Sequence, residues 1–137
     1  MIILDTDFLV DLLLGEPNAV AKAEELDKRG GFVTTSMNVD ELYHVVNFAF
    51  RGSDSKPIRE NLIRKAQTLF NNLPILSLEV GLAPDDVETR NIFLWEKRGN
   101  SSDTFIAMIA MRLKAETIVT NTDSFNILVS YLKIENY

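Results

Sequence analysis

Short runs of apolar, largely β-branched residues recur along the chain, separated by longer stretches in which apolar residues return at helical spacing. The runs do not alternate with polar residues, which is typical of strands covered on both faces. They predict four strands and a weaker fifth, at Ile2–Leu4, Phe32–Thr35, Ile75–Leu78, Thr117–Thr120 and Leu132–Glu135. The helical spacing predicts helices at Asn18–Arg29, Met37–Phe50, Pro57–Asn71, Pro84–Lys97 and Asp103–Lys114.

Strands that alternate with helices of this length predict a parallel sheet with helices on both faces. With right-handed crossovers the fold class is α/β: a doubly wound, three-layer α/β/α sandwich around a parallel sheet of four to five strands. The 137 residues contain no linker rich in Gly, Pro or Ser, so we expect a single domain spanning residues 1–137. In such a sheet the ligand crevice lies outside the carboxyl ends of the strands.

The amino-acid composition excludes only a few classes of protein. Hydrophobic residues at 46% and charged residues at 25% are ordinary for a globular protein. The absence of cysteine excludes disulfides and thiolate metal ligands. The apolar start carries Asp5, Asp7 and Asp11 without a basic segment, so it is neither a signal peptide nor a membrane span. We therefore expect a cytoplasmic protein that does not enter a membrane.

The net charge of −6 argues against a general nucleic-acid binder, which is usually basic. The charges are unevenly distributed, however, and phosphate contacts depend on particular Lys and Arg residues. Five basic residues fall within fifteen positions: Arg51, Lys56, Arg59, Arg64 and Lys65. This stretch is either a solvated helix face or a surface that guides a nucleic-acid backbone.

Four acidic residues are predicted to meet at the carboxyl edge of the sheet. Asp5 directly follows the first strand, and Asp123 lies three residues beyond the end of the fourth. Glu41 lies in the opening turns of the helix after the second strand. Asp103 opens the helix that returns into the fourth strand, so it also starts from that edge. The topology therefore brings all four carboxylates to one place.

Each acid also has an ordinary structural explanation. Asp5, Asp103 and Asp123 are natural helix N-caps, because a carboxylate there accepts backbone N–H bonds and complements the helix dipole. Glu41 is either half exposed or paired with a Lys or Arg, although its helix face is otherwise apolar. Coincidence explains four acids at one sheet edge less well than a functional site does. We interpret them as a site.

Converging carboxylates repel one another, and burial raises their pKa values unless a cation compensates. No Lys or Arg lies within ten positions of Asp5, and none adjoins Glu41 or Asp123. Oxygen ligands without cysteine, and with a single histidine, favour Mg²⁺ or Mn²⁺. One such ion activates water, and a second would stabilise the leaving oxygen of a phosphodiester displacement. Thr6 and Thr120 would hydrogen-bond a carboxylate or hold a water on the ion.

The order of these residues resembles the PIN-domain nucleases, and most closely the VapC toxins of toxin–antitoxin pairs. The matching segments are "IILDTDFLVDLL" at the start, "TTSMNVDELYHV" around Glu41 and "SSDTFIAMIAMRLKAETIVTNTDSF" near the end. The last is the most specific: an Asp, an alanine-dotted helix, a strand, then Thr-x-x-Asp and an aromatic residue. The resemblance covers essentially the whole chain, although the middle, Arg51–Arg98, carries no diagnostic motif.

The resemblance implies a Mg²⁺- or Mn²⁺-dependent endoribonuclease with a five-stranded parallel sheet. Asp5, Glu41 and Asp103 would coordinate the ion directly, and Asp123 would complete the shell or hold a bound water. RNA is the implied substrate. The implied partners are a second copy of the chain, forming a homodimer, and a small antitoxin that reaches into the pocket.

Two positions depart from the family pattern. The "TNTD" segment offers both Asn121 and Asp123 to the ion, and we favour Asp123, with Asn121 in a supporting place. Asp7 stands where the family usually has a small polar residue. It could add a ligand, cap the helix or face solvent, and a capping or outer role is favoured.

Rival functions remain open from the sequence. The start "IILDTDFLV" also resembles a haloacid-dehalogenase phosphatase, with Asp5 as nucleophile and Asp7 as acid, but Leu9 replaces the expected Thr or Val and Glu41 has no role there. A receiver domain needs an Asp after the third strand, where Glu79 follows Leu78 instead. A catalytically inactive PIN-fold binding module is the third alternative. The sequence also leaves open whether the protein is a toxin or a housekeeping nuclease.

Overall fold

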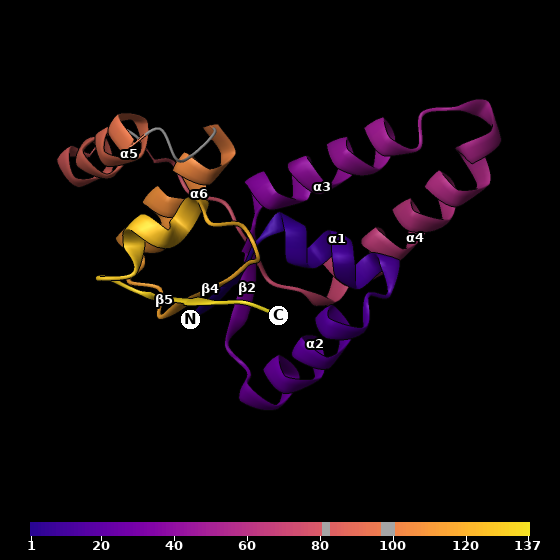
Figure 1. Cartoon of the computed structure of the whole chain (residues 1–137), viewed down its shortest axis with the longest axis horizontal. Coiled ribbons are helices and arrows are strands. Elements are labelled where there is room, and N and C mark those ends of the chain that lie inside the picture. Colours follow the sequence, from indigo (N-terminus) through magenta and orange to yellow (C-terminus); the bar gives the residue numbers. More distant parts are fainter. Residues whose placement is uncertain (81–82, 97–100) are drawn as a thin grey trace.

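A five-stranded parallel sheet forms the centre of the protein, as the sequence predicts. The computed structural model describes residues 1–80, 83–96 and 101–137, and for residues 93–96 and 101 the backbone alone (Figure 1). The strands are β1 (Ile2–Leu4), β2 (Phe32–Thr35), β3 (Ile75–Leu76), β4 (Thr117–Val119) and β5 (Lys133–Glu135), in the order β3-β2-β1-β4-β5. The helices are α1 (Thr6–Leu14), α2 (Pro17–Arg29), α3 (Ser36–Ala49), α4 (Lys56–Asn72), α5 (Pro84–Glu96) and α6 (Ser101–Arg112), with 3-10 turns η1 (Ser53–Ser55) and η2 (Ser124–Leu128).

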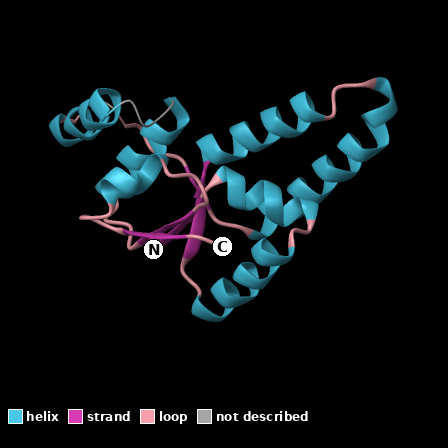
Figure 2. Ribbon diagram, viewed as in Figure 1, coloured by secondary structure: helices cyan, strands magenta, loops and turns pink. Residues whose placement is uncertain are grey.

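Helices cover both faces of the sheet, with α1 to α4 on one side and α5 and α6 on the other (Figures 1 and 2). Alternate residues of β1 divide between the two layers: Ile2 and Leu4 pack with α1, α2, α3 and α4, whereas Ile3 packs with α6 and η2. Both faces of the strand are therefore buried, which explains its continuously apolar sequence. The predicted three-layer α/β/α sandwich is confirmed. In the described ranges, no helix is both long and apolar enough to cross a membrane.

Helix boundaries differ from the sequence prediction where the apolar spacing carries no signal. The helix α1 was not assigned from the spacing, because the apolar residues of TDFLVDLLL are almost continuous. The helix α6 begins at Ser101, two residues before the predicted start at Asp103, because its polar first residues add nothing to an apolar pattern. It ends at Arg112 because Lys114 adopts a positive φ of 50°. Lys97, the predicted end of α5, lies outside the described residues.

A group of ion pairs joins α2 to the edge strand β5. Glu135 is buried, and its Oε2 atom accepts hydrogen bonds from Lys22 Nζ at 2.7 Å and from Arg29 Nη1 at 2.8 Å. Its Oε1 atom accepts from Lys133 Nζ at 2.8 Å. These contacts, above all the one from Arg29, hold the pKa of Glu135 well below its usual range.

We expect Glu135→Gln to lower the free energy of unfolding by about 3 kcal/mol at neutral pH, because part-buried Lys22 then lacks its carboxylate. A lowered carboxyl pKa stabilises the fold above the unfolded-state pKa, near 4.5, and loses that effect as the pH falls further. Denaturant unfolding should therefore show the two proteins converging in acid. Glu60→Gln, which removes an exposed pair with Lys56, is the control and should change stability by under about 0.5 kcal/mol. Equal loss in both variants would contradict the prediction.

Candidate active site

An acidic hollow of about 410 Å³ lies at the carboxyl edge of the sheet. It forms there because β1, β2 and β4 run parallel, so their carboxyl ends and the helices that follow meet at one edge. Within the described part of the chain, none of the residues lining it is Lys, Arg or His. The lining residues are Asp5, Thr6, Asp7, Val10, Asp11, Glu41, Val45, Asp103, Thr122 and Ser124.

Asp5 is the N-cap residue of α1, yet its carboxylate makes no capping hydrogen bond. The side chain turns instead toward two neighbouring elements. Its Oδ1 atom accepts from Asn38 Nδ2 at 3.0 Å, and its Oδ2 atom accepts from Thr120 Oγ1 at 2.8 Å. At 4% exposure, Asp5 is oriented by these two donors, one from α3 and one from the end of β4.

Burial, together with the charges of Asp7 and Asp103, raises the pKa of Asp5 to about 7, although the hydrogen bond from Thr120 lowers it. The cost of ionising Asp5 comes first from lost hydration and then from like charge. A cation in the hollow would relieve both effects. The electrostatics are those expected of a site built to hold positive charge.

Glu41 is oriented by a hydrogen-bond chain that starts at Asn38. Thr6 Oγ1 donates to Glu41 Oε2 at 2.6 Å, and Asn38 Nδ2 donates to Thr6 Oγ1 at 3.0 Å. Asn38 is fully buried and also forms a capping box with Thr35 at the start of α3. Sequence reasoning missed Asn38, and the spacing of Thr35 and Asn38 was the only local signal for it.

Asp103 reaches the hollow from the opposite layer of the fold. It lies in the first turn of α6, is buried and lines the hollow with Asp5 and Glu41. The helices α3 and α6 contact each other directly, which brings Asp103 and Glu41 to the same place. Three of the four acids named from the sequence thus line one hollow, from elements far apart in the chain.

Asp123, the fourth, is exposed and does not line the hollow. It is the N-cap residue of η2 without a capping hydrogen bond from its side chain, while its neighbours Thr122 and Ser124 do line the hollow. Asn121 faces elsewhere: its side chain exchanges hydrogen bonds with the backbone of Tyr137, at 3.1 and 3.3 Å. Its supporting role and that of Asp123 stay predictions.

Two further acids, Asp7 and Asp11, line the hollow one helical turn apart on α1; the sequence favoured a capping or outer-shell role for Asp7 and gave Asp11 no role in the site. Asp7 accepts hydrogen bonds from the backbone of Asn121 and Thr122. Asp11 Oδ2 accepts from Tyr137 Oη at 2.9 Å, a contact that, with burial of the ring, raises the pKa of Tyr137. The spacing of the two acids was visible in the sequence, but their partners lie over a hundred residues away.

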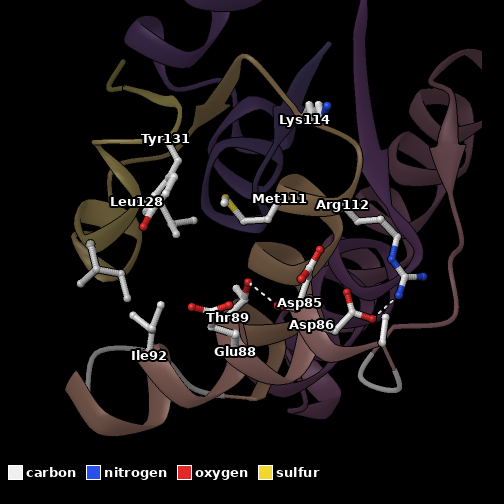
Figure 3. Close-up of a pocket in the computed structure, with 12 residues that line it drawn as sticks. Asp85, Asp86, Glu88, Thr89, Ile92, Met111, Arg112, Lys114, Leu128 and Tyr131 are labelled. Carbon is white, nitrogen blue, oxygen red and sulfur yellow. Dashed lines mark hydrogen bonds and ion pairs between the residues drawn. The ribbon is translucent and has the colours of Figure 1, made fainter.

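A second hollow, of about 380 Å³, lies between α5, the end of α6 and η2 (Figure 3). Its lining is partly apolar, with Ile92, Met111 and Leu128, and Asp86 forms an ion pair with Arg112. Two basic residues, Arg112 and Lys114, line this hollow together with its acids, whereas the described residues lining the first hollow include no Lys or Arg. The acidic hollow at the sheet edge is therefore the better candidate for chemistry.

The basic stretch from Arg51 to Lys65 does not contribute to the acidic hollow. It covers the α3–α4 connection and the first half of α4, and none of its residues is among those lining the hollow. Lys56 pairs with Glu60, and Arg59 donates to the Phe50 carbonyl at 2.5 Å. Lys56 and Arg59 thus make contacts within α4 and between α4 and the end of α3.

The oxygen atoms that line the hollow suit a hard divalent cation, although the acids described there are not gathered around a single point. In the described residues, no group of three or more His, Asp or Glu side chains is arranged to hold a metal ion. Mg²⁺, however, usually keeps several waters and takes only one or two carboxylates together with substrate phosphate oxygens. Among the described lining residues, the polar side chains offer only carboxylate and hydroxyl oxygens, which matches that preference.

The fold and the hollow define a class: a three-layer α/β/α protein with an acidic site at the carboxyl edge of a parallel sheet. A family model described as PIN domain matches residues 2–128. The chain belongs to the PIN-domain family. No curated protein matches the sequence.

Solved structures of similar fold cover nearly the whole chain. A VapBC2 structure from Rickettsia felis, bound to a promoter DNA fragment, matches with a TM-score of 0.71 and 21% identity over 100% of this chain and 99% of that chain. DNA-bound VapBC from Salmonella typhimurium gives 0.73 and 17%, over 98% and 96%. VapBC-1 from nontypeable Haemophilus influenzae gives 0.68 and 20%, over 99% and 98%. At these identities the likeness establishes the fold.

Proposed function

We propose that this protein is a Mg²⁺- or Mn²⁺-dependent endoribonuclease and the toxin of a VapBC-type toxin–antitoxin pair. One observation carries the proposal: Asp5, Glu41 and Asp103, from three separate elements, line a single hollow. Membership of the PIN-domain family supports a nuclease. The VapBC structures of similar fold support the toxin assignment.

Asp5, Glu41 and Asp103 are the residues that would hold the cation. Asn38 and Thr120 fix the orientation of Asp5, and Thr6 fixes that of Glu41. Such partners of metal ligands typically contribute about 10–100-fold to metal affinity or activity. Asp123 remains a candidate for the outer part of the shell, from its exposed place at the start of η2.

A divalent cation bound here would supply an activated water and neutralise charge on the scissile phosphodiester. The chain itself orients the RNA. The hydroxyls of Thr122 and Ser124 lie 3.1 Å apart and line the hollow; one donates to the other, which leaves the second hydroxyl proton free to donate to a phosphate oxygen. Asp5, with its raised pKa, can hold a proton until positive charge arrives.

The partners proposed are RNA as substrate, a cognate antitoxin and a second copy of the chain. The solved VapBC structures are toxin–antitoxin complexes, two of them on DNA, which supports an antitoxin partner here. A short reading frame beside this gene that encodes a DNA-binding protein, and whose product blocks the nuclease, would test the toxin assignment. Its absence would favour a housekeeping nuclease.

We expect the purified protein to cut single-stranded RNA with Mg²⁺ or Mn²⁺ and to lose the activity when EDTA is added. Asp103→Asn should lower the cleavage rate by more than about 100-fold, because even residues that only orient metal ligands contribute about 10–100-fold. Gel analysis of end-labelled RNA measures the rate, and circular dichroism checks that the variant folds.

Asp27→Asn, an exposed acid on α2, is the matched control and should cut at the wild-type rate. Hydrolysis of small phosphomonoesters with RNA left intact would instead indicate the phosphatase alternative. A folded protein with neither activity would indicate a binding module.

A further inference from the structure

Asp7 joins α1 to the loop that follows β4, across more than a hundred residues of sequence. One carboxylate oxygen, Oδ2, accepts from the backbone N–H of Asn121 at 2.7 Å and from that of Thr122 at 3.1 Å. The hydroxyl of Thr120 lies 3.1 Å from the same oxygen. The other oxygen, Oδ1, accepts from Phe8 N at 2.7 Å.

Two successive backbone N–H groups and a hydroxyl that converge on one point form an anion-binding nest. Here the chain fills the nest with its own carboxylate. Backbone N–H groups need a partner wherever a loop leaves its strand, and a charged acceptor makes stronger hydrogen bonds than a neutral one. Asp7 thus stabilises one conformation of residues 120–122 that the strand β4, which ends at Val119, does not itself impose.

That conformation decides where the next two hydroxyls lie. Thr122 N also donates to Thr120 Oγ1 at 3.1 Å, and Thr122 Oγ1 lies 3.1 Å from Ser124 Oγ. Thr122 and Ser124 both line the acidic hollow. A loop free to rotate at residues 121 and 122 would turn these hydroxyls away from Asp5 and Glu41.

We propose that Asp7 is a positioning residue, which fixes the loop after β4 so that Thr122 and Ser124 face the substrate phosphate. The inference deepens the proposed function and rests on it for the identity of that phosphate. A positioning role differs from that of a metal ligand, because the Asp7 carboxylate is already hydrogen-bonded to the loop N–H groups. It also differs from helix capping alone, because all the partners of Oδ2 are distant in sequence.

The direct test is backbone amide hydrogen exchange, measured by NMR in Asp7→Ala, Asp7→Asn and the wild type without RNA. In Asp7→Ala the amides of Asn121 and Thr122 should exchange about 10-fold faster or more, since each loses a charge-assisted hydrogen bond. Asp7→Asn keeps one accepting oxygen and should restore most of the protection. Asp27→Ala removes an exposed carboxylate from α2 and should leave both amides as in the wild type.

RNA cleavage supplies the second readout. In Asp7→Ala we expect kcat to fall about 10–100-fold with a smaller change in KM, and Asp7→Asn to recover a large part of kcat. Wild-type protection of both amides in Asp7→Ala would overturn the inference, as would an Asn variant as impaired as the Ala variant. If the wild type cuts no RNA, the proposed function fails, while the exchange data still decide the role of Asp7.

Discussion

Replacing Asp5 by asparagine should abolish RNA cleavage and at the same time stabilise the folded protein at about pH 8. The loss of activity is expected to exceed about 100-fold, because Asp5 is proposed as a direct ligand and outer partners alone contribute about 10–100-fold. The asparagine can keep both contacts: its oxygen accepts from Asn38, and its amide donates to the Thr120 hydroxyl. The hollow loses one charge without losing its packing.

The pH dependence follows from the raised pKa of Asp5, about 7 in the folded protein against 3.8 as its ordinary value. Between these values the folded state binds the proton more tightly than the unfolded state. Wild-type stability therefore falls as the pH rises through this window and stays low above it. Asp5→Asn has no carboxyl to ionise at this position. It should therefore be more stable than the wild type by on the order of 3 kcal/mol at about pH 8, and about equally stable at about pH 4.

Thermal unfolding at several pH values measures this effect, which corresponds to about 10 °C in Tm for a chain of this size. Mn²⁺ should raise the Tm of the wild type, because it binds the folded state, and should have a much smaller effect on Asp5→Asn. An Asn variant that cleaves RNA at the wild-type rate would remove Asp5 from the site. An unchanged Tm across the pH range would show that its charge is compensated.

Asn38→Asp should strongly destabilise the folded protein, although it is a conservative change. The Asn38 amide donates to Asp5 Oδ1 and to Thr6 Oγ1, both at 3.0 Å, in a fully buried position. The substitution keeps the shape but replaces the donor with a carboxylate oxygen facing another carboxylate. We expect a loss of about 3–5 kcal/mol at about pH 8, the range for an uncompensated buried charge.

Acidification should restore much of this loss, because two adjoining carboxyls can share a proton. Denaturant unfolding at about pH 8 and about pH 5 measures both effects, since the shared proton is bound at the lower pH. Asn47→Asp is the matched control: Asn47 lies on the same helix, is exposed, and should change stability by under about 0.5 kcal/mol. Similar losses in both variants would mean that the site around Asp5 is not the cause.

The strands and most helices could be predicted because their signal is local. Strands buried on both faces must be continuously apolar, and the ranges Ile2–Leu4 and Phe32–Thr35 match the structure at both ends. Periodicity fails for α1, because its apolar residues are almost continuous apart from Asp7 and Asp11, and α2, α3 and α4 all contact the helix. The parallel sheet followed from the alternation of strands and helices, whereas the strand order β3-β2-β1-β4-β5 comes from the structure alone.

The residues of the candidate site also fall into those that the sequence could predict and those that it could not. Asp5, Glu41 and Asp103 could be named because topology alone carries the carboxyl ends of parallel strands, and the helices beside them, to one edge. Asp123 shares that topology, yet its carboxylate lies outside the hollow because η2 begins there and turns Thr122 and Ser124 inward. No local sequence pattern shows which of several adjacent loop residues will face the hollow.

The sequence by itself determined the fold class and the sheet edge at which Asp5, Glu41 and Asp103 gather. Only the tertiary structure decided how those acids are oriented and which residues orient them. Asn38 and Asp7 owe their roles to partners 33 and 114 residues away, respectively. Apolar spacing reports burial against the next layer, whereas the direction of a buried hydrogen bond depends on atoms that only folding brings together.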